Sequence, residues 1–552
     1  MPLKREKEVI MRTEIRKAER WRQIILEFRS NANYENPFLD ADIAAEFTAP
    51  SGHRIKREAY WDGNNTYKIA FAPTEPGPWS WSITAEEGSG LNGTHGEIEC
   101  IEYSGDLAIY RHGFLKVHPS GRYLTYDDGT PFFWLGDTHW EFAYRECWDW
   151  SNHPGMESMF RGMADRRAAQ GFNVYQTNLR SDRSIGGQSN YWRKSSKGAL
   201  PNVQFYQQEL DRRMYYLADR GFVNALGFAW FMSIIDAIEQ QKELARYIIA
   251  RYGALPVIWT LAGEVAGYSG GEVRRKCIDG WREVAKYIEN LDGYGTLQTA
   301  HYTNERPFAK YYQEEDWFDF TLNQAGHGDY TVSQEDYREF FSKHSAKPFI
   351  EGECFYEFCS TLEINGTRLC TADMLRRVAY MSIQLGGCGY TYGAQGIWDC
   401  VLEKGNSSPI SRIFNRFDIT WYEAIDGIGA EQMGYMKTFY EGVHFEEFQP
   451  YEDPDIQKET SLFAQWAPLV TVNKNQDRMV IYYVASTRMT TKVKGLQNGL
   501  YQVRWFNPRT GEYTDASENL IPIHGAWELP DKKDSDDWLL VAEKQEEINL
   551  PV

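Results

Sequence analysis

Two glutamates each stand directly after a short apolar run, and this arrangement is typical of a pair of catalytic carboxyls. Glu264 follows residues 258–263, and Glu353 follows residues 347–352. Glycoside hydrolysis needs two carboxyls, because one protonates the leaving oxygen while the other attacks the anomeric carbon or activates a water. Each glutamate could instead pair with an arginine at the start of a loop. We favour the catalytic interpretation because both residues share this position and aromatic residues end several similar runs.

Eight such apolar runs lie between residues 106 and 450, with helical segments between most of them. One helical segment is marked by Met374, Val378, Met381 and Leu385, whose spacing places them on one helix face. Eight strands alternating with helices favour a (β/α)8 TIM barrel over a doubly wound sheet. No glycine-rich dinucleotide fingerprint follows the first run. The runs are 132–137, 172–178, 222–228, 256–261, 296–301, 318–323, 348–353 and 389–392.

The active site of a (β/α)8 barrel lies at the carboxyl ends of its strands, so the residues that end the runs are the candidates. Glu264 ends the fourth run and Glu353 the seventh, and these two strands lie nearly opposite each other in the ring. At the other strand ends we expect substrate-binding residues, namely Asp137, Trp140, Asn178, Trp230, His301, Tyr392 and Trp398. Some of the aromatic candidates among them could instead belong to the core, and Asp137 could cap the turn at Thr138.

Three histidines near the strand ends, His139, His301 and His327, raise the question of a metal site. None of them has the spacing of a zinc motif, so we expect no metal and no other cofactor. His301 is expected to bind a sugar hydroxyl instead. Glu351, two residues before the second catalytic glutamate, is expected to support the site or to pair with a barrel arginine such as Arg180.

The two ends of the chain are predicted to form strands without helices between them. Residues 42–47 and 66–71 alternate between apolar and polar side chains, and Pro and Gly separate such runs. We therefore expect an antiparallel β-sandwich over residues 1–105, the barrel over 106–450 and a second antiparallel β-sandwich over 451–552.

The composition narrows the classes of partner. The 552 residues carry a formal net charge of −19, which repels phosphate backbones and anionic lipids. Nucleic-acid and membrane partners are therefore not expected, and no apolar run approaches the ~20 residues of a membrane-spanning helix. Aromatic residues make up 15% of the chain, and aromatic rings pack on sugar faces. A carbohydrate partner is expected, and a homo-oligomer is compatible with the sequence.

The cysteines and the amino terminus bear on the cellular compartment. The eight cysteines are scattered and include no C-x-x-C pair. The first residues lack the apolar core of a secretory signal. Together these features favour reduced thiols and a cytoplasmic location.

Several motifs resemble those of the apiosidase-like glycoside hydrolases. The stretches before and after the predicted barrel also resemble the β-sandwiches that often flank these barrels, so the resemblance covers most of the chain. It implies a glycosidase on a (β/α)8 barrel. The barrel motifs are 112–117, 126–138, Lys347-Pro348-Phe349-Ile350-Glu351-Gly352-Glu353, 392–393 and 397–398, and the sandwich motifs are 36–38, 60–63, 71–79 and 505–511.

The fourth run departs from the family pattern, because it ends in Ala262-Gly263-Glu264 where Gly-Gly-Asp is usual. The longer side chain moves the proton donor, so the fitted sugar need not be apiose. Glutamate at both strand ends also resembles the retaining β-glycosidases of this barrel, which implies Glu264 as acid/base and Glu353 as nucleophile. We predict an exo-acting, retaining glycosidase that removes a terminal sugar from a plant-derived glycoside. The alternative is a non-catalytic carbohydrate-binding protein on a decayed barrel.

Overall fold

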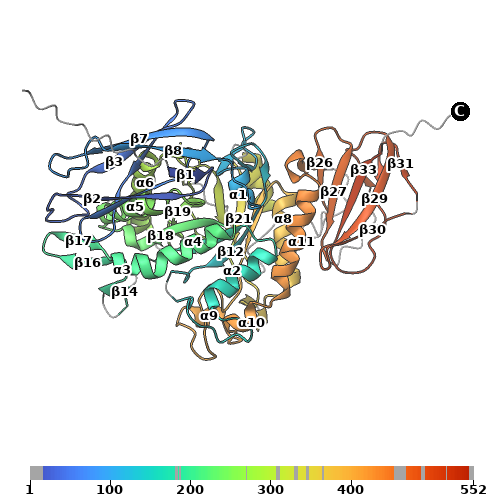
Figure 1. Ribbon diagram of the computed structural model, residues 1–552. Helices are drawn as coiled ribbons and strands as arrows, with labels where there is room; N and C mark the ends of the chain where they lie inside the picture. Colours follow the sequence, from blue (N-terminus) through green and yellow to red (C-terminus); the bar gives the residue numbers. More distant parts are fainter. Residues whose placement is uncertain are drawn as a thin grey trace, which may run out of the picture.

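Three groups of elements follow one another along the chain (Figure 1). Strands of the amino-terminal part, in blue, lie at one end of the view, and strands of the carboxyl-terminal part, in red, lie at the other. A parallel sheet with its helices lies between them. The computed structural model describes residues 16–143, 145–180, 184–185, 188–268, 270–305, 311–327, 334–343, 347–363, 366–452, 468–485, 492–517 and 519–545.

The amino-terminal part consists of two sheets that share one hydrophobic core. Phe47 of the first sheet stacks on Phe71 of the second, with ring centroids 3.8 Å apart. The pairing is antiparallel except between β1 and β8, which are parallel where we expected only antiparallel pairs. The first sheet has the order β1 (Arg16–Glu19), β8 (His95–Ile101), β7 (Gly77–Ala85), β3 (Ile43–Thr48), β4 (Arg54–Glu58), and the second has the order β2 (Ile24–Arg29), β6 (Thr66–Phe71), β5 (Tyr60–Trp61).

The central sheet is parallel throughout and curls back on itself. Its seven strands correspond to seven of the eight predicted runs. The eighth, 296–301, is not a strand in the structure, because it pairs at a single residue on each side. Those parallel bridges, Trp259 to Gln298 and His301 to Leu322, link it to both edge strands. The order is β19 (Val257–Gly263), β18 (Val223–Trp230), β13 (Val174–Asn178), β12 (Trp134–His139), β24 (Gly389–Tyr392), β21 (Phe349–Glu353), β20 (Thr321–Gln324).

Helices alternate with these strands, as the apolar spacing predicts. Met374, Val378 and Met381 of α8 and the following Leu385 are all buried, and most other residues of this helix are buried as well. Within the described residues, no helix combines the length and apolar character needed to cross a membrane. The helices are α1 (Ala108–Arg111), α2 (Met159–Ala169), α3 (Val203–Phe205), η1 (Tyr206–Leu210), α4 (Asp211–Asp219), η2 (Phe231–Ile234), α5 (Ile238–Tyr252), α6 (Gly271–Leu291), α7 (Gln334–Lys343), α8 (Ala372–Gln384), α9 (Ser411–Phe414), α10 (Trp421–Ala424), α11 (Ile428–Gly442) and η3 (Phe445–Glu447).

Short strands outside the central sheet lie before its first strand or in the segments that connect its strands. A three-stranded antiparallel sheet precedes β12, and three small hairpins follow β13 and β21. These strands are β9 (Leu115–Val117), β10 (Leu124–Tyr126), β11 (Pro131–Phe132), β14 (Ser184–Ile185), β15 (Gln188–Ser189), β16 (Trp192–Ser195), β17 (Gly198–Pro201), β22 (Ser360–Glu363) and β23 (Gly366–Leu369).

The carboxyl-terminal part is a seven-stranded antiparallel sheet whose two faces enter different cores. Val480 and Tyr482 of β27 join the large core that contains α8, whereas Met479 and Ile481 join a separate core with Trp527. Figure 1 shows α8 and α11 between the parallel sheet and this sheet. The order is β25 (Phe448–Tyr451), β26 (Leu469–Asn473), β27 (Arg478–Tyr483), β33 (Trp538–Lys544), β29 (Gly499–Asn507), β30 (Glu512–Asp515); β31 (Ile521–Ile523) pairs with β29, and β28 (Lys492–Val493) pairs with β32 (Trp527–Glu528).

A buried ion pair joins α8 to this sheet. Arg376 Nε lies 2.9 Å from Asp537 Oδ2, and Arg376 Nη2 lies 2.8 Å from Asp537 Oδ1. The guanidinium also donates to Gln432 Oε1 at 2.6 Å. Both charged side chains are buried, so the pair fixes how the sheet sits on the helix.

We expect Arg376→Met to lower the free energy of unfolding by about 3 kcal/mol, because it leaves a buried carboxylate without its main partner. Arg509 Nη1 lies 3.8 Å from Asp537 and limits the loss. The melting temperature from calorimetry is the measurement. The double variant R376M/D537L removes both charges and should recover most of the loss. A single variant that melts with the wild type would contradict the role of the pair.

Candidate active site

The two predicted catalytic glutamates face each other across one amide. Glu264 directly follows β19, Glu353 ends β21, and Gln324 ends β20. Gln324 Nε2 donates to Glu264 Oε1 at 3.1 Å and to Glu353 Oε1 at 3.0 Å. Because both oxygens contact the same nitrogen at these distances, they are at most 6.1 Å apart. The strand ends therefore bring the two carboxyls within reach of one small ligand.

Glu264 lies in a turn directly after the strand rather than in the strand itself. Its φ is 56°, in the left-handed region that non-glycine residues seldom adopt. The preceding Gly263 lies under the Trp230 ring, and a Cβ at this glycine would come within 2.1 Å of a ring carbon. Only glycine therefore lets the indole lie against the strand end beside the carboxyl. Such local backbone strain is common at functional sites.

Two histidines contact the carboxyl group of Glu353. His301 Nε2 lies 3.1 Å from Oε2, and His327 Nε2 lies 3.0 Å from Oε1. Burial alone would raise the pKa of Glu353, but the contacts with His301 and His327 outweigh it and hold this pKa well below its usual range. Burial lowers the pKa of His327, but Glu353 more than compensates, so the imidazole pKa is raised. Glu353 is thus a buried carboxylate, only 5% exposed.

Glu264 is shifted in the opposite direction. Burial and the neighbouring charge of Glu353 raise its pKa, and hydrogen bonds from Tyr268 and Gln324 offset only part of this rise. The Tyr268 hydroxyl donates to Glu264 Oε1. The pair therefore consists of one carboxyl whose pKa is raised and one whose pKa is lowered, and these are the directions of shift that a general acid beside a nucleophile requires.

Aromatic side chains surround the pair. Trp140 lies edge-on to Trp230, with centroids 5.8 Å apart, and edge-on to His301 at 5.3 Å. On the other side, the ring of Tyr356 lies 4.6 Å from His327 and 6.1 Å from Trp398. Four of the seven predicted substrate-binding residues, Trp140, Trp230, His301 and Trp398, therefore gather at the carboxyl pair.

Asp137 lies elsewhere, in a buried ionic cluster. Its Oδ2 accepts from Arg167 Nε at 2.5 Å and contacts His139 Nε2 at 3.0 Å. His139 Nδ1 contacts Glu146 at 2.9 Å. Burial lowers the pKa of His139, but Glu146 and Asp137 more than offset this and raise the pKa to about 9. The carboxylate of Asp137 is thus bound within the protein.

Asn178 and Tyr392 are also bound within the protein. Asn178 Nδ2 donates to the carbonyl of Ala229 at 2.9 Å, and its Oδ1 accepts from the Arg180 backbone at 2.7 Å. The Tyr392 hydroxyl donates to Glu357 at 2.6 Å. These hydrogen bonds within the protein engage the polar atoms of both side chains, and among the described residues neither side chain forms a hydrogen bond with Glu264 or Glu353 that brings it to the carboxyl pair.

The role of Gln324 escapes the sequence analysis because a register shift decides it. Asn323 pairs with Glu351, whereas the next residue, Gln324, pairs with Glu353. Asn323 Nδ2 accordingly donates to Glu351 Oε2 at 2.8 Å, which gives Glu351 the predicted supporting role. Simple strand alternation would turn two successive side chains to opposite faces. The expected partner for Glu351, Arg180, instead forms an ion pair with Glu141.

Within the described ranges, no group of three or more His, Cys, Asp or Glu side chains is arranged to hold a metal ion. All eight cysteines carry free thiols. The three histidines considered for a metal site divide between two clusters. His139 lies in the ionic cluster with Asp137, and His301 and His327 lie on Glu353.

Residues 118–447 match the sequence model of the apiosidase-like catalytic domain, which is more than half of the chain. The chain belongs to the apiosidase-like family. The apiosidase-like domain is flanked by a match to a domain of unknown function, DUF5060, over residues 17–86. Residues 464–543 match a model named for collagen binding in a collagenase. Among curated proteins, none matches this chain.

Solved glycoside hydrolases share the fold of this apiosidase-like protein. One from Bacteroides vulgatus ATCC 8482 has 17% identity and a TM-score of 0.69, and the match covers 96% of this chain and all of that one. A family 5 glycoside hydrolase from the same organism has 20% identity and a TM-score of 0.63 over 79% of this chain and 94% of its own. The apiosidase-like catalytic domain and the shared fold identify a glycosidase.

The opposite shifts of the two carboxyls predict how the pH–activity profile responds to substitution. His327→Gln removes an imidazole that lowers the pKa of Glu353, so the pKa of Glu353 should rise and move the acidic limb of kcat/KM to higher pH. Tyr268→Phe removes a hydrogen bond that lowers the pKa of Glu264, so it should move the alkaline limb to higher pH instead. Hydrolysis of an aryl glycoside is measured from the lowest pH at which each protein stays folded up to about pH 10. Movement of the same limb in both variants would contradict the assignment.

Proposed function

We propose that this protein is an exo-acting, retaining glycosidase in which Glu264 is the acid/base and Glu353 the nucleophile. The observation that carries the proposal is the pair of carboxyls joined by Gln324, one with a raised pKa and one with a lowered pKa. A protein that only binds a sugar does not need two neighbouring carboxyls whose pKa values are shifted in opposite directions.

In the first step, a Glu353 oxygen forms a bond to the anomeric carbon while the bond to the leaving oxygen breaks. Glu264 gives its proton to that oxygen, and a glycosyl ester of Glu353 results. The ester carries no negative charge, so the contribution of Glu353 that raises the pKa of Glu264 disappears. Glu264 then accepts a proton from water, the water oxygen bonds to the anomeric carbon, and Glu353 leaves as a carboxylate.

The separation of the carboxyls supports retention of configuration. Retaining enzymes hold their carboxyls about 5–5.5 Å apart, whereas inverting enzymes keep about 6.5–9.5 Å to admit a water. The upper limit of 6.1 Å between the two Oε1 atoms falls below the inverting range. Glu353 is also deeply buried, which favours the end of a sugar chain over its middle.

The architecture is proposed to be a complete (β/α)8 barrel between two β-sandwiches. The segment 296–301 bridges β19 on one side and β20 on the other, which supports its assignment as the eighth barrel strand. The two amino-terminal sheets share one core, and the small β28–β32 sheet packs on one face of the carboxyl-terminal sheet. These contacts support the two sandwiches.

The sugar is proposed to contact Trp140, Trp230, His301 and Trp398. The two indoles that meet beside Glu264 provide apolar ring surface, and sugar faces pack on such surface. Asp137, Asn178 and Tyr392 are left out of the proposed contacts, because their polar atoms are bound within the protein. The substrate class remains a plant-derived glycoside with a terminal sugar.

Substitution of each carboxyl should give a different kinetic signature. Glu264→Gln should lower kcat/KM for alkyl glycosides by about 10²–10⁴-fold but far less for 2,4-dinitrophenyl glycosides, whose leaving group needs no proton. Glu353→Gln should remove turnover of both substrates. Steady-state kinetics on both substrates, with melting temperatures as a check of folding, is the measurement. Full turnover by the double variant E264Q/E353Q would overturn the proposal, and sugar binding without turnover by the wild type would favour a binding protein.

The stereochemical course provides an independent test. Proton NMR of the first-formed product should show the same anomeric configuration as the substrate, because two displacements at one carbon restore it. A 2-deoxy-2-fluoro glycoside should add one glycosyl group to Glu353, detected by mass spectrometry of a digest. An inverted first product would exclude the covalent intermediate.

A further inference from the structure

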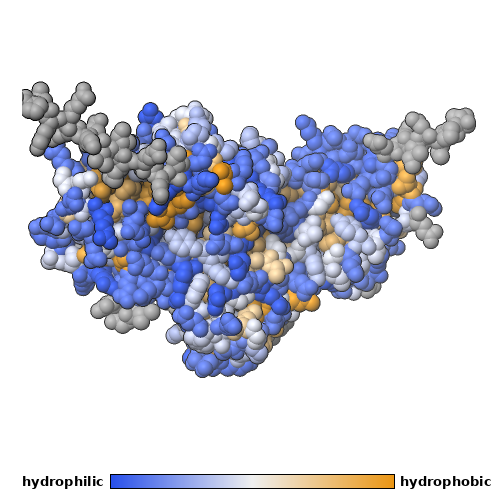
Figure 2. Space-filling model, in the orientation of Figure 1, coloured by the Kyte–Doolittle hydropathy of each residue, from blue (hydrophilic) through white to orange (hydrophobic). Residues whose placement is uncertain are grey.

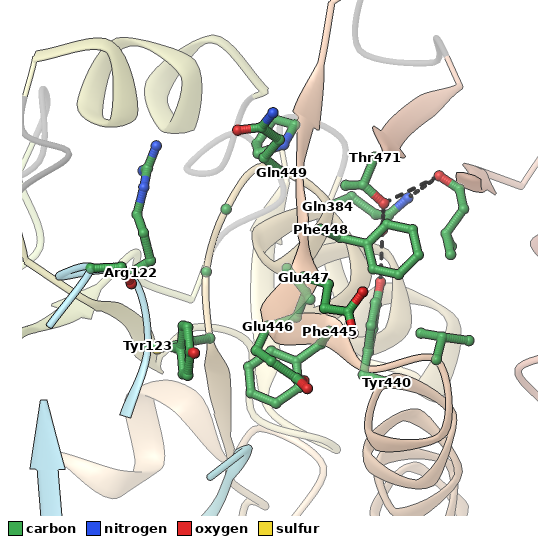
Figure 3. Close-up of a pocket in the computed structure, with 18 of the residues that line it drawn as sticks. Arg122, Tyr123, Gln384, Tyr440, Phe445, Glu446, Glu447, Phe448, Gln449 and Thr471 are labelled. Atoms are coloured by element: carbon green, nitrogen blue, oxygen red, sulfur yellow. Dashed lines mark hydrogen bonds between the residues drawn. The ribbon is translucent and has the colours of Figure 1, made fainter. Parts of the chain in front are cut away.

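A cleft of about 630 Å³ lies between the barrel and the carboxyl-terminal sheet. One wall is the turn between β9 and β10, with Arg122 and Tyr123, and the other is the chain that leaves α11, including Phe448 and Gln449. Figure 3 shows Arg122 and Gln449 reaching toward the same end of the cleft from these two walls. The ends of α8 and α11 form its floor. The volume falls within the range of sites for small ligands, and such sites are common between domains.

This cleft is separate from the carboxyl pair. Its lining includes Gly387 and Cys388, which directly precede β24, whereas Glu353 stands at the carboxyl end of the neighbouring strand β21. The two sites therefore lie at opposite ends of the parallel strands. A ligand in the cleft cannot touch Glu264 or Glu353.

Two cations of the lining, Arg122 and Lys474, have no ion-pair partner among the residues that the structure describes. Arg122 and Lys474 are exposed, and neither makes an ion pair or a side-chain hydrogen bond with a described residue. The two acidic lining residues differ in this respect. Glu447 forms an ion pair with Arg478, and Glu446 lies 3.5 Å from the imidazole of His444, which is a cation only when it is protonated. On a chain with a net charge of −19, two unpaired cations at one cleft form a local site for an anion.

Two half-buried aromatic rings line the same cleft. The Tyr123 ring is stacked by His118, with centroids 4.3 Å apart at 14°, and the Arg478 guanidinium lies 5.5 Å from the Phe448 ring. Each ring is thus held in place by a neighbour. Aromatic rings held near cations suit a ligand that has both an apolar ring face and a negative charge.

We propose that this cleft binds a saccharide that carries carboxylates, such as a chain of uronic acids. Arg122 and Lys474 bind the carboxylates, and the rings of Tyr123 and Phe448 pack on the sugar faces. Gln449 and Ser120 supply hydrogen-bonding groups to hydroxyls. The site does not depend on catalysis by the carboxyl pair, so it stands or falls separately from the proposed function.

Calorimetric titration of the full-length protein with trigalacturonate tests this proposal. The wild type should bind it, and Arg122→Ala/Lys474→Ala should weaken the binding by about tenfold or more, because hydrogen bonds to charged groups are lost. The control variant Arg29→Ala/Lys56→Ala removes the same two charge types from exposed sites on the amino-terminal strands and should bind as the wild type does. Melting temperatures confirm that each variant is folded.

Neutral maltotriose and acetate complete the test. Maltotriose lacks the carboxylates and should bind at least tenfold more weakly than trigalacturonate, and acetate lacks the sugar ring and should also bind more weakly. Three results would overturn the proposal. These are no binding of trigalacturonate to the wild type, equal binding to the wild type and to Arg122→Ala/Lys474→Ala, or binding of maltotriose or acetate as tight as that of trigalacturonate.

Discussion

The buried negative charge of Glu353 imposes the strictest requirement on this structure. An ionised carboxylate away from water is stable only with charged or hydrogen-bonding partners. Those partners, His301 and His327, come from the 296–301 segment and from the loop after β20. The 296–301 segment, β20 with the loop after it, and β21 must therefore keep their relative positions for the two histidines to contact Glu353. Burial raises the pKa of Glu264, and the charge of Glu353 raises it further.

The sequence alone predicts the order of the parallel strands and the position of the two glutamates at strand ends, because apolar runs and the residues that end them are local features. It fails where tertiary detail decides. The shift between β20 and β21 brings Gln324 rather than Asn323 to Glu353, and no local pattern marks it. Asp137, which the sequence places at the end of its strand, lies inside β12 (Trp134–His139), and Arg167 from α2 takes up its carboxylate. A strand end thus identifies candidates, and the neighbouring helices decide which of them face the ligand.

The aromatic residues show likewise that residue type alone does not distinguish a binding residue from a core residue. Trp79, Trp134, Trp259, Trp281 and Trp421 are fully buried and serve packing. The aromatic residues at the carboxyl pair differ through their neighbours rather than through their type. Trp230 lies there because Gly263 leaves room for its ring. The face seen in Figure 2 is mostly hydrophilic, with small hydrophobic areas between.

The carboxyl-terminal sheet gives alternate residues of β27 to two different cores, and this has a consequence for evolution. A module that is exchanged between proteins must keep its own core closed when its neighbour changes. Here Val480 and Tyr482 complete the apolar surroundings of α8, so a gene fusion that removed the sheet would uncover that helix. The catalytic region and the carboxyl-terminal region match separate families, yet they share this apolar contact, so a substitution on one side of it changes the packing of the other.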